Sequence, residues 1–265
     1  MESDLNKKKI FLSIITVNKN NAKGLELTIQ SVIEQSFNDF EYIIIDGGSD
    51  DESINIIKKY EDKITYWISE TDHGIYNAMN KGIKKAIGTY CLFLNSGDYL
   101  YNNEVLKDFF SINSSGDIIY GEQLIEKNGI IIKTTAPEPE HITFSVFLNY
   151  SLPHQCTFIK RNLFDIIGMY NEKNKIISDW EWISIALFRF NCSLRKIPIP
   201  VTVYNTNGIS NNNDLLEEHL REKRRALERN FPRIIPDYDE YTRVLKRYQK
   251  IPRIIAAIFN KIKKG

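Results

Sequence analysis

The chain has 265 residues, of which 42% are hydrophobic and 26% are charged, enough apolar sequence for one large or two small globular domains. Its formal net charge is +1 at pH 7, so overall charge gives no support to nucleic-acid binding. No stretch approaches the roughly 20 apolar residues that span a bilayer, and the N-terminus does not resemble a signal peptide. Three widely spaced cysteines in apolar settings favour buried thiols and a cytoplasmic location.

The first hundred residues alternate between two patterns. Short apolar runs rich in β-branched residues predict buried strands, and segments with apolar residues at helical spacing predict helices between them. The strands are expected at 10–16, 41–46, 64–69 and 90–94, and the helices at 24–36, in a short segment capped by Ser53, and at 75–87. This alternation predicts right-handed crossovers and a parallel sheet with helices on both faces.

The second half of the chain breaks this rhythm. The dipeptide Asn128-Gly129 predicts a hairpin within 117–135, and strands are expected at 193–199 and 201–204. Helices are expected at 161–167, 179–190 and 215–229, with a polar loop at 205–214. The sequence therefore predicts an α/β fold with a mostly parallel central sheet, flanking helices and further helices at the C-terminus.

Polar residues follow each of the four predicted parallel strands. They read TVNKNN (16–21), DGGSDD (46–51), ETDHG (70–74) and NSGD (95–98). Ligands of such sheets bind at the carboxyl ends of the strands, so these four segments predict a shared site. The alternative is ordinary turn chemistry, in which Asp46, for example, caps its own GGS turn.

Carboxylates gathered in one crevice repel one another unless a cation joins them. Oxygen ligands without His or Cys suit Mg²⁺ or Mn²⁺, and these ions in turn bind phosphate. Asp98, which follows a glycine, is the predicted metal ligand. The chain has neither the glycine-rich dinucleotide fingerprint after the first strand nor a P-loop, so the pattern favours a nucleotide diphosphate held through a metal.

Several segments resemble the family 2 glycosyltransferases, which are inverting enzymes with the GT-A fold. They are SIITVNKNN, SVIEQS, FEYIIIDGGSDD, ETDHGIYNAMNKGIKKAIG, FLNSGD, PHQCTFIKR and ISDWEW, in this order over residues 10–210. The resemblance implies a GT-A domain over 1–210. A helical, basic extension over 211–265 is predicted from its own charge and helical spacing, since the resemblance ends near residue 210. The resemblance also implies a nucleotide-diphospho-sugar donor, most often a UDP-sugar, and a saccharide or lipid-linked saccharide acceptor in cell-envelope polysaccharide synthesis.

The resemblance also assigns roles to individual residues. It implies that the catalytic base is Asp179 and that the metal, Mn²⁺ or Mg²⁺, is held by Asp98. The implied nucleotide-binding residues are Thr16, Asn20, Asp46, Asp72, Lys81, Asn95, Ser96 and Gly97. The candidates for donor or acceptor contacts are His154, Trp180 and Glu181, of which Glu181 is also the rival base. Asn95 stands where many members have an aspartate, which weakens the charge at the metal.

These residues have plainer interpretations as well. Asp179 could cap the helix that it begins, and His154 and Trp180 could belong to the core. The segment 241–265 has no acidic residue and many Lys and Arg, so it could pack on the core or attach to the inner face of the cytoplasmic membrane. No nucleic-acid-binding motif accompanies this charge.

The sequence thus predicts an inverting, metal-assisted hexosyltransferase. Two alternatives stay open at this point, a sugar nucleotidyltransferase and a non-catalytic protein that binds nucleotide sugars. The nucleotidyltransferase would need a glycine-rich loop with Arg and Lys after the first strand, and TVNKNN is not such a loop.

Overall fold

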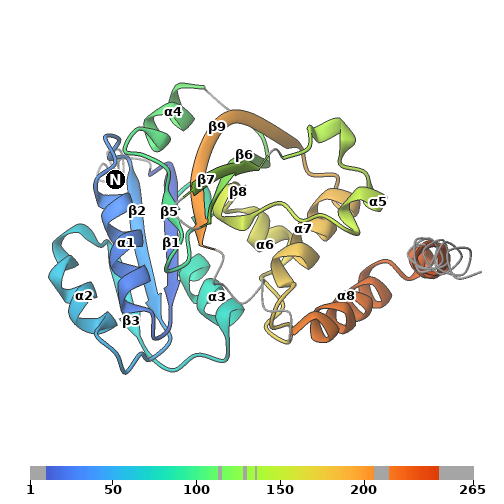
Figure 1. Cartoon of the computed structure of the whole chain (residues 1–265), viewed down its shortest axis with the longest axis horizontal. Coiled ribbons are helices and arrows are strands. Elements are labelled where there is room, and N and C mark those ends of the chain that lie inside the picture. Colours follow the sequence, from blue (N-terminus) through green and yellow to red (C-terminus); the bar gives the residue numbers. More distant parts are fainter. Residues whose placement is uncertain (1–9, 113–114, 128–129, 135, 206–214, 245–265) are drawn as a thin grey trace, which may run out of the picture. The chain divides into compact units, whose positions relative to one another are not determined.

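The computed structural model describes residues 10–112, 115–127, 130–134, 136–205 and 215–244 (Figure 1). The chain forms two compact units, Met1–Leu215 and Leu216–Gly265. The predicted domain boundary after residue 210, the turn at Asn128-Gly129, most of the 205–214 loop and most of the basic segment 241–265 lie outside the described residues. Within the described part of the chain, no helix is long and apolar enough to cross a membrane.

The first unit is organised around one nine-stranded sheet in the order β3-β2-β1-β4-β8-β6-β9-β5, with β7 paired to β6. The strands are β1 (Leu12–Asn18), β2 (Phe40–Asp46), β3 (Tyr66–Ser69), β4 (Tyr90–Phe93), β5 (Tyr99–Leu100), β6 (Ile118–Lys127), β7 (Ile130–Thr134), β8 (Thr157–Lys160) and β9 (Leu194–Asn205). Strands β3, β2, β1 and β4 are mutually parallel, as predicted. Strand β8 runs antiparallel to both β4 and β6, so the sheet as a whole is mixed.

Among the described residues, the first unit has seven α-helices, and an eighth begins the second unit. They are α1 (Ala22–Ile33), α2 (Ser53–Lys59), α3 (Ile75–Lys85), α4 (Val105–Ser111), α5 (Phe144–Phe147), α6 (Leu163–Ile167), α7 (Ser178–Phe188) and, in the second unit, α8 (Leu216–Asn230). The crossovers α1, α2 and α3 and the helix α7 match the predicted segments closely. Ser53 does not cap α2, because it is the first helical residue and instead donates its backbone N–H to Asp51 Oδ1.

The core lies on both faces of the parallel strands, as the burial of β1, β2 and β4 requires. On one face, Leu12 and Ile14 of β1 belong to the same buried cluster as Leu25 and Ile29 of α1. On the other face α3 approaches closely at Gly82, where a Cβ would lie 2.4 Å from Ile15 Cγ2. This close approach fixes α3 against the sheet, so its N-terminus is held at the carboxyl end of the parallel strands.

The register of the parallel strands aligns their polar ends. Asn18, the last residue of β1, pairs with Asp46, the last residue of β2, and Asp46 pairs with Ser69 at the end of β3. Strands β1, β2 and β3 therefore end level with one another, each in a side chain that can form hydrogen bonds. The loops that follow them begin from one edge of the sheet.

Candidate active site

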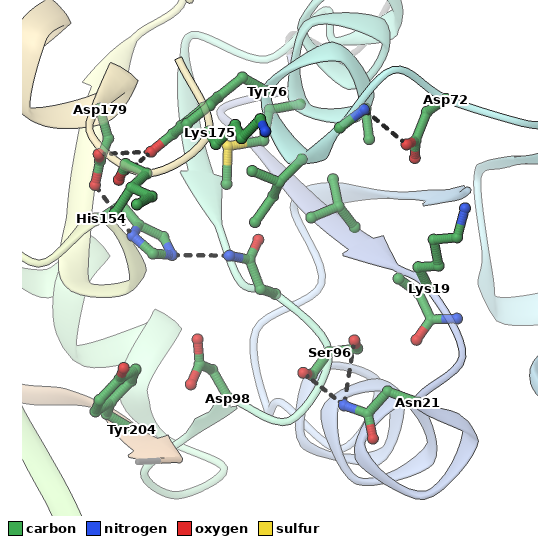
Figure 2. Close-up of a pocket in the computed structure, with 18 residues that line it drawn as sticks. Lys19, Asn21, Asp72, Tyr76, Ser96, Asp98, His154, Lys175, Asp179 and Tyr204 are labelled. Carbon is green, nitrogen blue, oxygen red and sulfur yellow. Dashed lines mark hydrogen bonds and ion pairs between the residues drawn. The ribbon is translucent and has the colours of Figure 1, made fainter. Parts of the chain in front are cut away.

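A cavity of about 630 Å³ lies at this edge of the sheet (Figure 2). Its walls come from the loops after β1, β3 and β4, from the start of α3, from the segment before α7 and from the end of β9. The lining residues are Val17, Asn18, Lys19, Asn21, Asp72, Gly74, Ile75, Tyr76, Ala78, Met79, Asn95, Ser96, Asp98, His154, Lys175, Ile176, Asp179 and Tyr204. Three carboxylates, Asp72, Asp98 and Asp179, thus share one opening.

The turn that carries Asp98 is fastened to helix α1 by one hydroxyl. Thr28 Oγ1 donates to the Asp98 carbonyl (2.7 Å) and accepts from the Gly97 backbone N–H (2.9 Å). Gly97 has φ of 105°, a left-handed conformation that favours glycine, so the chain reverses sharply before Asp98. The Asp98 side chain is 6% exposed and lines the cavity.

We expect the substitution Thr28→Val to destabilise this turn. Valine has nearly the same shape, but it leaves the Gly97 N–H and the Asp98 carbonyl without their buried partner, which costs about 1–3 kcal/mol of unfolding free energy. Urea unfolding measures the effect, and Thr28→Ser, which keeps the hydroxyl, is the matched control. Equal stability of the Thr28→Val and wild-type proteins would contradict this role.

The carboxylate of Asp46 lies behind the cavity and does not line it. Its oxygens accept hydrogen bonds from Asn18, from Ser69 and from the backbone and side chain of Ser49, and the residue has no exposed surface. Burial alone would raise the pKa of Asp46, but these hydrogen bonds outweigh it and hold the pKa below its ordinary value. The predicted contact of Asp46 with the base or ribose stays a prediction; in the structure its carboxylate oxygens are held by Ser49 of its own turn, by Asn18 and by Ser69.

Asp72 occupies the space beside this turn. Its Oδ1 accepts from the Gly74 N–H (3.0 Å), and its Oδ2 would lie only 2.4 Å from a Cβ placed on Gly47. Lys19 covers the same glycine, and its Nζ donates to the Gly47 carbonyl (3.3 Å). A glycine at position 47 therefore leaves room for the Asp72 carboxylate at the rim of the cavity.

Asp179 lies at the opposite side of the cavity, in the first turn of α7 (Figure 2). The Tyr76 hydroxyl lies 2.9 Å from Asp179 Oδ1 and 2.8 Å from the Ile176 carbonyl. His154 Nδ1 lies 3.5 Å from Asp179 Oδ2. Helix α7 has no side-chain cap, so Asp179 is not the helix cap that the alternative interpretation offered.

These contacts keep the Asp179 carboxylate ionised. Burial by itself would raise the pKa of Asp179, but His154, the Trp180 backbone N–H and Tyr76 together hold it below the ordinary value. The start of a helix also favours a negative charge. An ionised carboxylate in an open cavity can accept a proton from a hydroxyl group, which is the chemistry of a general base.

His154 connects Asp179 to the turn that carries Asp98. Its Nε2 lies 3.0 Å from Asn95 Nδ2, and its Nδ1 lies 3.5 Å from Asp179 Oδ2. Burial lowers the pKa of His154, but the charges of Asp179 and Asp98 outweigh burial and raise it above the ordinary value. The histidine is therefore a cavity residue that is fixed from both sides.

The raised pKa of His154 predicts a pH-dependent contribution to stability. Because the folded state favours the charged imidazole, this contribution is complete below the unfolded pKa of about 6.5 and is lost as the pH rises through the folded pKa. We expect His154→Gln to lower the free energy of unfolding, and with it Tm, by more at pH 5.5 than at pH 9. Thermal unfolding at the two pH values measures the difference, and an equal cost at both would contradict it.

The residues around Asp98 suit a divalent cation that is bound together with a diphosphate. The described residues contain no group of three or more His, Cys, Asp or Glu side chains that could hold a metal by themselves. Mg²⁺ and Mn²⁺ are commonly held by one or two carboxylates plus substrate phosphates, so a single carboxylate facing a cavity fits such an ion. Asp98 is the residue that would hold it.

The other predicted site residues lie outside the cavity lining. Thr16 is buried beside the Tyr42 hydroxyl, and Lys81 pairs with Glu70 at 2.8 Å. Asn20 is exposed and accepts from the Asp50 N–H. Trp180 is buried and donates to the Phe147 carbonyl, and the buried Glu181 accepts from Asn171 and Asn174. Of the predicted set, the structure brings together Asp72, Asn95, Ser96, Asp98, His154 and Asp179.

Sequence reasoning missed six polar residues of the lining, namely Asn18, Lys19, Asn21, Tyr76, Lys175 and Tyr204. A signal existed for the first three, since they belong to the polar segment after the first strand. Tyr76 is the second residue of α3 and contacts Asp179, which lies 103 positions away in the sequence, a contact that no local pattern indicates. Lys175 and Tyr204 enter the cavity from the segment before α7 and from the end of β9.

Comparison with known proteins agrees with this geometry. Residues 13–158 match the model of the family described as Glycosyl transferase family 2. The chain belongs to this family. It is accordingly a glycosyltransferase of the nucleotide-sugar-dependent class, and the nucleotidyltransferase and non-catalytic alternatives lose their support.

Curated glycosyltransferases resemble the chain over most of its length. A PGL/p-HBAD biosynthesis glycosyltransferase of Mycobacterium bovis is 29% identical over 221 residues, which is 79% of this chain and 82% of the relative. An uncharacterised glycosyltransferase of Rickettsia prowazekii is 32% identical over 180 residues, which is 64% of this chain and 56% of the relative.

Solved structures show the same fold. TarS of S. aureus in complex with UDP-GlcNAc has a TM-score of 0.62 at 22% identity, covering 75% of this chain and 59% of that chain. The mannosyltransferase PcManGT of Pyrobaculum calidifontis, in complex with GDP-Man and Mn²⁺, has a TM-score of 0.58 at 15% identity. The match covers 86% of this chain and 65% of that chain. The chain thus spans less than two thirds of these solved chains, and its fold is GT-A, as predicted.

Proposed function

We propose that the protein transfers a sugar, with inversion, from a UDP-sugar to a hydroxyl group of a saccharide or lipid-linked saccharide in the synthesis of cell-envelope glycans. One observation carries the proposal, the convergence of Asp98 and an ionised Asp179 on a single cavity at the carboxyl ends of the parallel strands. A UDP-GlcNAc complex of TarS and relatives named for PGL/p-HBAD biosynthesis support the choice of donor and pathway.

The reaction is a single displacement at the anomeric carbon. Asp179 accepts the proton of the acceptor hydroxyl, whose oxygen forms the new glycosidic bond while the bond from the anomeric carbon to the diphosphate breaks. Tyr76 and His154 hold the two carboxylate oxygens of Asp179, so the base is positioned before the acceptor arrives. A divalent cation held by Asp98 would neutralise the charge that develops on the departing diphosphate.

The proposal is tested by thermal unfolding in the presence of nucleotide sugars. A ligand that binds only the folded state raises Tm, by an amount that grows with its concentration relative to Kd. We expect one UDP-sugar to raise Tm more than GDP-sugars do, and more with Mn²⁺ than without it. No shift with any nucleotide sugar would refute the proposed donor class.

We propose in addition that residues 241–265 attach the enzyme peripherally to the inner face of the cytoplasmic membrane. The segment is basic, and basic residues near an anionic surface contribute about 1 kcal/mol each. Cosedimentation with vesicles of anionic lipid is expected for the full chain and not for a chain that ends at residue 240. Equal cosedimentation of the two would contradict this attachment.

A further inference from the structure

We infer that Asn18 recognises the nucleoside of the donor, by accepting a hydrogen bond at Oδ1 from an N–H or O–H group of that nucleoside. Asn18 ends strand β1, lines the cavity and is 4% exposed. Its Oδ1 is buried and has no hydrogen-bond partner among the described residues. A buried acceptor without a partner costs free energy, so this atom is expected to gain one when a ligand fills the cavity.

The hydrogen bond from Asn18 to the Asp46 carboxylate fixes the orientation of the Asn18 amide. Its Nδ2 donates to Asp46 Oδ1 at 2.7 Å and lies 3.3 Å from Ser49 Oγ. The Asp46 carboxylate is ionised and can only accept hydrogen bonds, so rotation of the amide by 180° would place oxygen against oxygen. Oδ1 is therefore the atom left without a partner, and it needs a donor.

This arrangement gives Asp46 a function that differs from the predicted one. Register pairs Asp46 with Asn18 across β1 and β2, and Ser69 Oγ and the Gly48 and Ser49 N–H groups hold the carboxylate from the other side. Asp46 is then a positioning residue, which acts on the ligand only through the amide of Asn18. The buried network behind the cavity wall thereby presents one hydrogen-bond acceptor at a fixed place.

The position within the cavity indicates which part of the donor Asn18 meets. Asp179 and His154 lie on one side of the cavity, Lys19 and Asp72 lie on the other, and Ser96 and Asp98 lie along the wall between (Figure 2). With the transferred sugar at Asp179 and the diphosphate at Asp98, the nucleoside extends toward Lys19, the residue that follows Asn18. Phosphate oxygens offer no donor at neutral pH, whereas uridine offers the imide N–H and the ribose hydroxyls.

The inference rests on the proposed function, and the following binding measurements distinguish a failure of the inference from a failure of the proposed function. Dissociation constants are measured by calorimetry for UDP, 2′-deoxy-UDP, 3′-deoxy-UDP and 3-methyl-UDP, with the wild-type protein and with Asn18→Ala. We expect one analogue, the one that lacks the recognised donor, to bind the wild-type protein about tenfold more weakly than UDP. We expect this difference to fall within twofold in Asn18→Ala, and the identity of the analogue distinguishes ribose from base.

A control variant separates recognition from stability. Ser69→Ala removes another hydrogen bond of the same Asp46 carboxylate, but Ser69 does not line the cavity. It is expected to keep the tenfold discrimination, and Asn18→Ser replaces Asn18→Ala if the alanine variant does not fold. If the wild-type protein binds all three analogues as tightly as UDP, or if Asn18→Ala keeps the discrimination, the inference is wrong while the proposed function stands. Absence of UDP binding by the wild-type protein would refute both.

Discussion

The substitution Asp179→Asn is expected to lower kcat by about 10²–10⁴-fold, the usual contribution of a general base. Asparagine keeps the shape of the side chain and can still accept from the Tyr76 hydroxyl, but it cannot take a proton from the acceptor. Binding of the UDP-sugar should change little, because the nucleoside is expected on the opposite side of the cavity and the diphosphate at Asp98, on the wall between the two sides. Initial rates and calorimetric titrations on the same variant measure both quantities.

Glu181 provides the discriminating comparison for this prediction. It lies on the same helix, but its carboxylate accepts hydrogen bonds from Asn171 and Asn174 and is absent from the cavity lining. We expect Glu181→Gln to change kcat far less than Asp179→Asn does. If Glu181→Gln abolishes turnover while Asp179→Asn keeps it, the base has been assigned to the wrong carboxylate.

The substitution Asp98→Asn is expected to have the second large effect. It removes the carboxylate that would hold the cation, and transition-state stabilisation of a departing diphosphate is worth several kcal/mol, so kcat/KM should fall at least about 10²-fold. The extra thermal stabilisation that Mn²⁺ gives to the UDP-sugar complex should disappear. Differential scanning fluorimetry with and without Mn²⁺, combined with initial rates, checks both parts.

A surface carboxylate serves as the control for Asp98. Asp165 pairs with Arg161 on an exposed part of α6, and it does not line the cavity. Asp165→Asn should leave both the activity and the response to Mn²⁺ unchanged. Full retention of the Mn²⁺ response in Asp98→Asn would show that the cation is bound elsewhere.

The parallel half of the fold could be predicted from the sequence because its signals are local. Each of the first four strands is an apolar run, and each intervening helix has apolar residues at helical spacing, so both element type and order follow from periodicity. The direction of β8, which lies between β4 and β6, could not be predicted, because strand pairing depends on contacts between distant segments. The short strand β5, of two residues, has no periodic signal.

The part of the site that could be predicted from the sequence is the part formed by residues that follow the parallel strands. Asp72, Asn95, Ser96 and Asp98 follow parallel strands directly, and the structure places all four on the cavity. Asp46 follows a strand as well, yet its side chain turns back to the GGS turn and to Asn18, a choice that depends on side-chain geometry.

Contacts between the two halves of the chain were beyond sequence reasoning. Tyr76 and Asp179 meet at 2.9 Å, and His154 lies between Asn95 and Asp179. The unpaired oxygen of Asn18 is visible only when every hydrogen bond around Asp46 is known. Such satisfied and unsatisfied polar atoms are properties of the folded molecule and have no periodic signature.

A crystal structure of the complex with UDP and Mn²⁺ tests the central claim most directly. We expect Mn²⁺ in contact with the Asp98 carboxylate and the β-phosphate, the uridine beside Asn18 and Lys19, and open space between the β-phosphate and Asp179 for the transferred sugar. A nucleotide bound outside this cavity, or a cation bound away from Asp98, would contradict it.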